Sequence, residues 1–176
     1  MSSFAERIVL LTAASAGLLV VWAGVGSSAP TRPQTKMEQN QPLAIIVNRS
    51  NPVTKLTLSE VRKIFLGEQG HWANGHRITV VMLDQGWPER KAVLKSIYRM
   101  NESDFKRYFV QATFTGEVFS PPKTLATPEG ARKFVLNLPS AIGYVSADQV
   151  DDTVKVVQVD GQLPGEKGYK LRLDEP

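Results

Sequence analysis

The sequence predicts an α/β domain of three layers, in which helices cover both faces of a mostly parallel central sheet of about four or five strands. Two observations predict this class. The apolar run LAIIV at 43–47 lacks the alternation of a half-exposed strand, which indicates burial on both faces, and the run ITVVML at 78–83 indicates a second strand. Between such runs, apolar residues recur at three- and four-residue intervals, which is the spacing of amphipathic helices.

The first strand, the first helix and the second strand form a predicted βαβ unit. Residues 48–52 (NRSNP) end the first strand with turn-forming side chains. Thr57 and Glu60 have the spacing of a helix capping box, and Gly67 ends the helix that they start. The run at 78–83 then returns as a strand, which is the order of two parallel strands joined by a crossover helix.

Further helices and strands complete the predicted domain. Pro88 suits the first turn of a helix that ends near Met100, and Asn101 is a suitable cap for the next helix. Another helix opens at Thr127 and ends before Pro139. The remaining predicted strands are AIGYV at 141–145, VKVVQV at 154–159, and an edge strand in the tail in which Tyr169, Leu171 and Leu173 alternate with charged residues.

The residues before the first strand are predicted to lie outside this domain. Residues 1–29 contain an uncharged apolar run at 8–26, and we interpret them as a signal peptide or, because about 20 residues span a bilayer, as an uncleaved anchor. Residues 30–41 are polar and contain proline, which predicts a linker. The domain then covers 42–160 and the tail 161–176. Both alternatives place the domain in the periplasm, either free or anchored to the inner membrane by residues 8–26.

The composition excludes several classes of function. The chain has no cysteine, which rules out disulfides and thiolate metal sites. The net charge of +4 is spread along the chain without a basic block, so we expect no nucleic-acid binding. The two histidines, His71 and His76, have no carboxylate at metal-ligand spacing, and we expect neither a metal nor a cofactor.

The carboxylates do not form a catalytic pattern either. Four of them fall in the first turns of predicted helices, where negative charge complements the helix dipole: Glu60, Glu89, Glu102 and Glu129. No nucleophile stands beside a base, so the sequence predicts a protein that is not an enzyme.

Two separated motifs carry a resemblance to a known family. The first is Val47-Asn48, followed by Ile64-Phe65-Leu66-Gly67, Trp72 and Asn74-Gly75, and the second is the run PSAIGYV at 139–145. Together they resemble the second lobe of phosphate ABC transporter substrate-binding proteins, which are type 2 periplasmic binding proteins. The resemblance covers residues 43 to about 150 and implies one lobe of a family whose members clamp their ligand between two lobes.

The resemblance also implies where a ligand site would lie. The family's phosphate loop, R-S-D-G-S-G-T, falls near residues 83–90, where this chain lacks the serine, glycine and threonine donors and has Leu83 in place of the arginine. Polar residues after the first two strands are the candidates for ligand contacts, because such sheets bind ligands at strand ends. They are Asn48, Arg49, Ser50, Asp84, Gln85, Gly86 and Arg90.

Each candidate has a plainer interpretation. Asn48 and Ser50 suit a turn before Pro52, and Asp84 suits the turn before Pro88. Arg49 and Arg90 could replace the lost positive charge or remain solvated at the surface.

Two functions remain open from the sequence. The first is a periplasmic solute-binding-like protein for phosphate or a related oxyanion. The alternative is a non-transport structural or protein-interaction module of the periplasm or cell envelope, built on a binding-protein lobe. Because only one lobe is present, ligand binding would need a homodimer, a partner protein or an open site at the strand ends.

Overall fold

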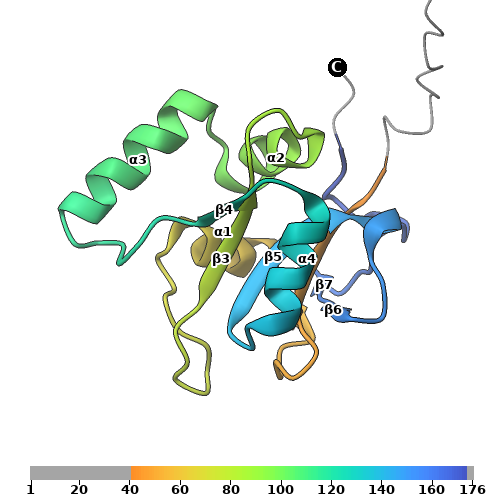
Figure 1. The fold of residues 1–176 in the computed structure, drawn as a ribbon. Coiled ribbons are helices and arrows are strands. Elements are labelled where there is room, and N and C mark those ends of the chain that lie inside the picture. Colours follow the sequence, from red (N-terminus) through yellow and green to blue (C-terminus); the bar gives the residue numbers. More distant parts are fainter. Residues whose placement is uncertain (1–40, 174–176) are drawn as a thin grey trace, which may run out of the picture. The chain divides into compact units, whose positions relative to one another are not determined.

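The computed structural model describes residues 41–173, which build a five-stranded sheet with helices against it and a separate two-stranded sheet (Figure 1). The strands are β1 (Leu43–Asn48), β2 (Lys55–Leu56), β3 (Thr79–Leu83), β4 (Lys123–Leu125), β5 (Ala141–Ser146), β6 (Val154–Val156) and β7 (Gln158–Val159). The helices are α1 (Leu58–Leu66), α2 (Pro88–Val93), α3 (Glu102–Phe114) and α4 (Pro128–Asn137), with a π-helical turn η2 (Leu94–Tyr98) and a 3₁₀ turn η3 (Ala147–Gln149).

The predicted signal peptide or anchor and nearly all of the predicted linker lie outside the described residues. Within residues 41–173, no helix is long and apolar enough to cross a bilayer.

The five-stranded sheet has the order β4-β3-β5-β1-β6. Strand β3 pairs in parallel with β4 and β5, whereas β1 pairs antiparallel with β5 and β6. Four of the five strands therefore point in one direction and β1 points in the other, which confirms the mostly parallel sheet. All six residues of β1 are buried, as the continuous apolar run predicted.

The prediction of a βαβ unit was wrong. Strands β1 and β3 run in opposite directions, and β5 lies between them in the sheet. A run of apolar residues reports burial on both faces but carries no information about strand direction. Here the chain leaves β1 at one edge of the sheet, passes through α1 and enters β3 at that same edge.

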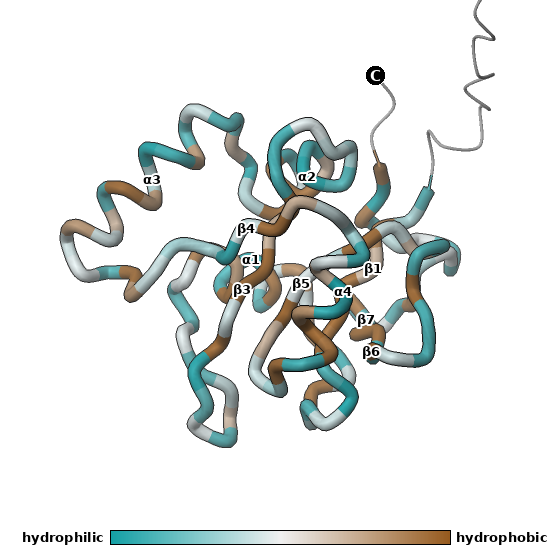
Figure 2. The backbone as a smooth tube through the Cα atoms, in the orientation of Figure 1, coloured by the Kyte–Doolittle hydropathy of each residue, from teal (hydrophilic) through white to brown (hydrophobic). Residues whose placement is uncertain are grey.

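Helices cover both faces of the sheet, as predicted. Tyr144 of β5 points to one face, where its ring lies 6.3 Å from that of Phe65 in α1. The neighbouring Gly143 faces α4, which approaches so closely that an added Cβ would lie 3.4 Å from a methyl group of Val135. Figure 2 shows that the most hydrophobic stretches of the backbone lie in the central strands between these layers.

The local signals of α1 act as the sequence predicts. The Thr57 side chain accepts a bond from the Glu60 backbone N–H (3.1 Å), and the Glu60 carboxylate accepts one from the Thr57 N–H (2.7 Å). Gly67 ends the helix in the left-handed region with φ of 80°. Residues adjacent to α1 thus supply hydrogen bonds to backbone groups at both ends of the helix that have no partner within it.

Three predicted elements differ in detail. The helix from Pro88 continues through the π-helical turn η2, and the run 154–159 divides into β6 and β7, which belong to different sheets. In the tail, Tyr169 and Leu171 are buried against β1: the Leu43 N–H donates to the Leu171 carbonyl (2.9 Å), and the Tyr169 hydroxyl donates to the Leu43 carbonyl (2.7 Å). A single antiparallel bridge, Pro42 to Arg172, takes the place of the predicted edge strand.

Candidate functional site

The seven predicted ligand contacts fall into two groups at opposite edges of the sheet. Asn48 ends β1 and pairs with Val154, the first residue of β6, so its group lies where the other strands begin. Asp84 follows the last residue of β3, so its group lies where the other strands end. Because β1 runs against its neighbours, Asn48, Arg49 and Ser50 do not converge with Asp84, Gln85, Gly86 and Arg90 (Figure 1).

Asn48 holds the carboxyl end of α4. Its amide nitrogen donates to the carbonyls of Val135 (3.0 Å) and Leu136 (2.6 Å), which are among the last carbonyls of that helix. Its amide oxygen accepts from the N–H and the hydroxyl of Ser50. Every polar atom of the Asn48 side chain therefore binds another part of the chain.

Arg49 is an exposed side chain whose guanidinium donates to the carbonyl of Asp152 in the segment before β6. A shallow hollow is lined by Arg49 and Asp152 together with β6. Its lining also includes Lys155, and the carboxylate-bearing Asp152 offsets part of the positive charge of these two cations.

The second group forms the carboxyl edge of the sheet, by which we mean the residues that follow β3 and open α2. Asp84, Gln85 and Gly86 are exposed there. The Asp84 N–H donates to the Leu125 carbonyl (2.8 Å), and the Gln85 N–H donates to the Asp84 carboxylate (2.8 Å). Gly86 adopts φ of +99°, a turn conformation that favours glycine before the helix.

Arg90 is buried at this edge and its guanidinium is engaged on all three nitrogens. Nε lies 2.6 Å from Glu102 Oε1, Nη2 lies 2.9 Å from Glu102 Oε2, and Nη1 donates to the Leu83 carbonyl (2.7 Å). The ring of Phe105 lies 5.1 Å from the guanidinium carbon. Arg90, the candidate to replace the family's arginine, therefore connects β3, α2 and α3 through its hydrogen bonds.

The Arg90–Glu102 pair shifts both titrations toward the charged forms. Burial lowers the pKa of Arg90, but the hydrogen bonds and charge of Glu102 outweigh burial, so the pKa is raised. The hydrogen bond from Arg90 lowers the pKa of Glu102. The pair stays ionised across the physiological range.

Glu89 is a feature that the sequence did not reveal. It was interpreted as a first-turn carboxylate, yet it is only 3% exposed, and its Oε2 has no hydrogen-bond partner. Burial raises its pKa, a bond from its own backbone N–H lowers it, and nearby Asp148 raises it further. A first-turn glutamate looks the same in sequence whether it faces solvent or protein, so no sequence signal distinguished this one.

The carboxyl edge therefore carries more negative than positive charge and has few free hydrogen-bond donors. Asp84, Glu89 and Glu102 bring carboxylates to it, whereas the one arginine buried there is already paired. A desolvated phosphate needs several free N–H or O–H donors. Within residues 41–173, no group of three histidine or acidic side chains is placed to hold a metal ion.

This fold is one lobe of the α/β type found in solute-binding proteins, with the strand ends at one edge of the sheet. Comparison with solved structures gives the particular type: the chain has the fold of one lobe of phosphate ABC transporter substrate-binding proteins. One such protein, from Clostridium perfringens and solved with bound phosphate, is 25% identical with a TM-score of 0.62, and the match covers 76% of this chain and 53% of that one.

Two more distant neighbours share the fold. An ABC-type phosphate transport receptor from Vibrio cholerae is 23% identical over 72% of this chain and 49% of its own, with a TM-score of 0.59. PstS from Borrelia burgdorferi is 14% identical over 77% of this chain and 56% of its own, with a TM-score of 0.59. This chain thus spans about half the length of these structures.

No protein-family model matches the sequence, and no curated protein matches it.

Proposed function

We propose that this chain is a non-transport binding module of the cell envelope, built on one lobe of a phosphate-type substrate-binding protein. In this proposal it acts outside the cytoplasm, where residues 1–29 would direct or anchor it, and it does not take phosphate at the carboxyl edge. One observation carries the proposal: Arg90 is only 4% exposed, and all three of its guanidinium nitrogens bind Glu102 or the Leu83 carbonyl, so it is not presented to a ligand.

The electrostatics of the carboxyl edge support the same proposal. An anion there would meet the exposed carboxylate of Asp84, and the positive charge of Arg90 is offset by its ion pair with Glu102, so the edge offers an anion little electrostatic attraction. Two neighbours of known structure match this chain over 53% and 49% of their own lengths. In this proposal a second wall over the edge is supplied by a partner protein or a second copy.

A second candidate function is binding of phosphate or a related oxyanion at this same edge. The neighbour from Clostridium perfringens, solved with bound phosphate, favours it. In this chain the candidate donors for such a ligand are the backbone at Gly86 and the Gln85 side chain, because both residues are exposed and the bond from Gln85 Nε2 to Glu102 Oε2 is long, at 3.4 Å.

A thermal-shift titration of the purified full chain with phosphate, sulfate and ionic-strength-matched sodium chloride separates the two candidates. A ligand at 100 times its Kd adds about 2.7 kcal/mol to the stability of the folded state, which is readily seen as a rise in Tm. The first proposal predicts that phosphate and chloride give the same curve. A saturable rise with phosphate that is lost in Gln85→Ala would overturn it and support the second.

A further inference from the structure

A cleft of about 610 Å³ lies away from the carboxyl edge, beside the first half of β3. Strand β4 pairs only with Val81–Leu83, so Thr79 and Val80 have no β4 partner and line the cleft. The other walls are the end of α1 and the segment 118–124. On the far side of β3, Thr79 and Val80 pair with the first residues of β5, which places the cleft toward the edge where the parallel strands begin.

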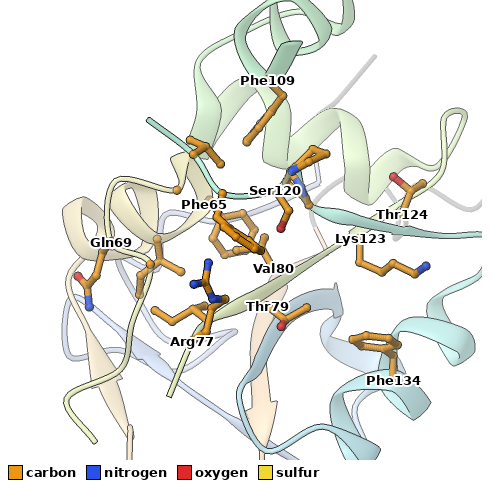
Figure 3. A pocket seen from close by; sticks show the side chains of 18 residues that line it. Phe65, Gln69, Arg77, Thr79, Val80, Phe109, Ser120, Lys123, Thr124 and Phe134 are labelled. Carbon is orange, nitrogen blue, oxygen red and sulfur yellow. The ribbon is translucent and has the colours of Figure 1, made fainter. Parts of the chain in front are cut away.

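The lining combines aromatic rings, hydroxyl groups and positive charge. Four phenylalanines contribute to the walls, and three hydroxyl side chains, Thr79, Ser120 and Thr124, lie among them. Within residues 41–173, the charged residues of the lining are Arg77 and Lys123, and neither aspartate nor glutamate lines the cleft. Figure 3 shows Arg77 and Lys123 on either side of Thr79. The lining therefore complements a negative group attached to an apolar body.

Arg77 differs from Arg90 in its surroundings, because Arg77 is exposed whereas Arg90 is buried and ion-paired with Glu102. Its guanidinium lies 3.8 Å from the centroid of the Phe119 ring, and in residues 41–173 no carboxylate or carbonyl binds it. A guanidinium stacked on a ring keeps its N–H groups in the plane, where they can bind a carboxylate with two parallel hydrogen bonds. Stacking thus holds the cation in place and leaves its binding edge open.

The ring that holds Arg77 is itself exposed. Phe119 is 76% accessible to solvent although it lines the cleft, where Phe65, Phe109 and Phe134 also contribute rings. Exposed aromatic surface beside a concave site is typical of a place where a ligand or partner covers it. An inorganic anion would leave these rings uncovered, whereas an organic anion would cover them.

We propose that this cleft binds an organic anion with an aromatic or branched apolar body, with Arg77 and Lys123 binding the anionic group and the phenylalanine rings packing against the body. The volume is within the ~300–1,000 Å³ of small-molecule sites. The inference deepens the proposed function and rests on it, because it gives the binding module a ligand class and a location that is not the carboxyl edge.

The test is a ¹H–¹⁵N NMR titration of the full chain with three matched probes: phenylacetate, its neutral isostere phenylacetamide, and acetate, which has the charge without the ring. We expect saturable shifts with phenylacetate, with a Kd in the millimolar range or below, in the amides of residues 67–80 and 118–124. Phenylacetamide and acetate should each bind at least 5-fold more weakly. Equal binding of phenylacetate and phenylacetamide, or no saturable shifts with phenylacetate, would overturn the proposal.

Variants that remove a positive charge test which side chains bind the anionic group. Arg77→Gln and Lys123→Gln should each weaken phenylacetate binding at least 3-fold, whereas Lys133→Gln, an exposed lysine of α4 outside the cleft, should not change it. Arg77 and Lys123 are both exposed, so the variants are expected to fold. Shifts confined to the amides of Asp84–Gly86 would contradict the cleft and would instead report binding at the carboxyl edge, so failure of this inference is distinguishable from failure of the proposed function.

Discussion

Arg90 and Glu102 form a two-bonded ion pair between α2 and α3, with 2.6 Å from Nε to Oε1 and 2.9 Å from Nη2 to Oε2. The pair lies at the edge where phosphate-type proteins would place their ligand loop, and it uses the arginine that the sequence left available. The same contact therefore stabilises the fold and removes an anion donor.

Removal of Arg90 should destabilise the domain strongly. Arg90→Ala removes the Arg90 bond from the Leu83 carbonyl and leaves the Glu102 carboxylate with only the long 3.4 Å bond from Gln85 Nε2, and we expect the free energy of unfolding to fall by about 2–3 kcal/mol in urea denaturation. Arg107→Ala is the matched control, because Arg107 pairs with Asp104 at the surface. That exposed pair should contribute about 0.5 kcal/mol or less. Equal losses in the two variants would refute this role of Arg90.

The same pair predicts a loss of stability in acid. Arg90 lowers the pKa of Glu102 in the folded state below its unfolded value of about 4.3, so the stabilisation is present above pH ~4.3 and is lost as the pH falls through the folded pKa. Thermal unfolding between pH ~6 and pH ~3 measures this. Glu102→Gln should show a shallower fall in Tm over that range, and an unchanged slope would mean that the pair is not formed in solution.

Glu89 should have the opposite effect on the pH dependence of stability. Burial raises its pKa, so the folded state holds the proton more tightly than the unfolded state, and stability from this group is lost as the pH rises through the folded pKa. Glu89→Gln keeps the shape without the buried charge, and we expect its Tm at neutral pH to exceed that of the native chain by about 1–3 °C. The gain should disappear near pH 4, where the native carboxyl is protonated.

Glu129→Gln serves as the control for Glu89. Glu129 occupies the first turn of α4 and is exposed, so its charge only complements the helix dipole. Its replacement should leave Tm unchanged or slightly lower at neutral pH. A higher Tm in both variants would show that net charge, and not burial of Glu89, sets the effect.

The amide group of Asn48 should be needed for the full stability of the domain. Asn48→Ala removes two donors from the end of α4 and should lower the free energy of unfolding by about 1–2 kcal/mol. Asn48→Asp should be worse, because a carboxylate would face the Val135 and Leu136 carbonyls. Asn137→Ala, at an exposed position of α4, is the control and should have a small effect. If Asn48→Asp were as stable as the native chain, the proposed amide contacts would be wrong.

Gly67 should not tolerate a side chain. An added Cβ would lie 2.8 and 2.9 Å from the two methyl groups of Val118, and the backbone has φ of +80°. Gly75 has φ of +83° with nothing within 4 Å, so Gly75→Ala carries only the conformational penalty, about 1 kcal/mol. Gly67→Ala should lower the free energy of unfolding by about 1–3 kcal/mol more. Chemical denaturation of both variants gives the difference, and equal losses would exclude the clash.

Several elements follow from local sequence alone. The capping box of Thr57 and Glu60, the stop at Gly67 and the cap at Asn101 all form as expected, because each depends on residues within one helical turn. The apolar runs gave the buried strands β1, β3 and β5 and, with the amphipathic helices, the three-layer class. The two motifs around residues 47–75 and 139–145 indicated the lobe whose fold the solved neighbours share.

Strand direction, ion pairing and the cleft depend on contacts between residues far apart in the sequence, so only the tertiary structure decided them. Because β1 runs antiparallel to β5, the expected βαβ unit did not form, and Asn48 and Asp84 lie at opposite edges of the sheet. The sequence did not show this, because burial patterns do not encode strand direction. Only the packing of α3 against α2 gave Arg90 its partner Glu102, and only the short length of β4 opened the cleft beside Arg77. The sequence determined which apolar runs form strands and where α1 begins and ends, whereas long-range contacts determined which charged side chains are buried, which are paired and which remain available to a ligand.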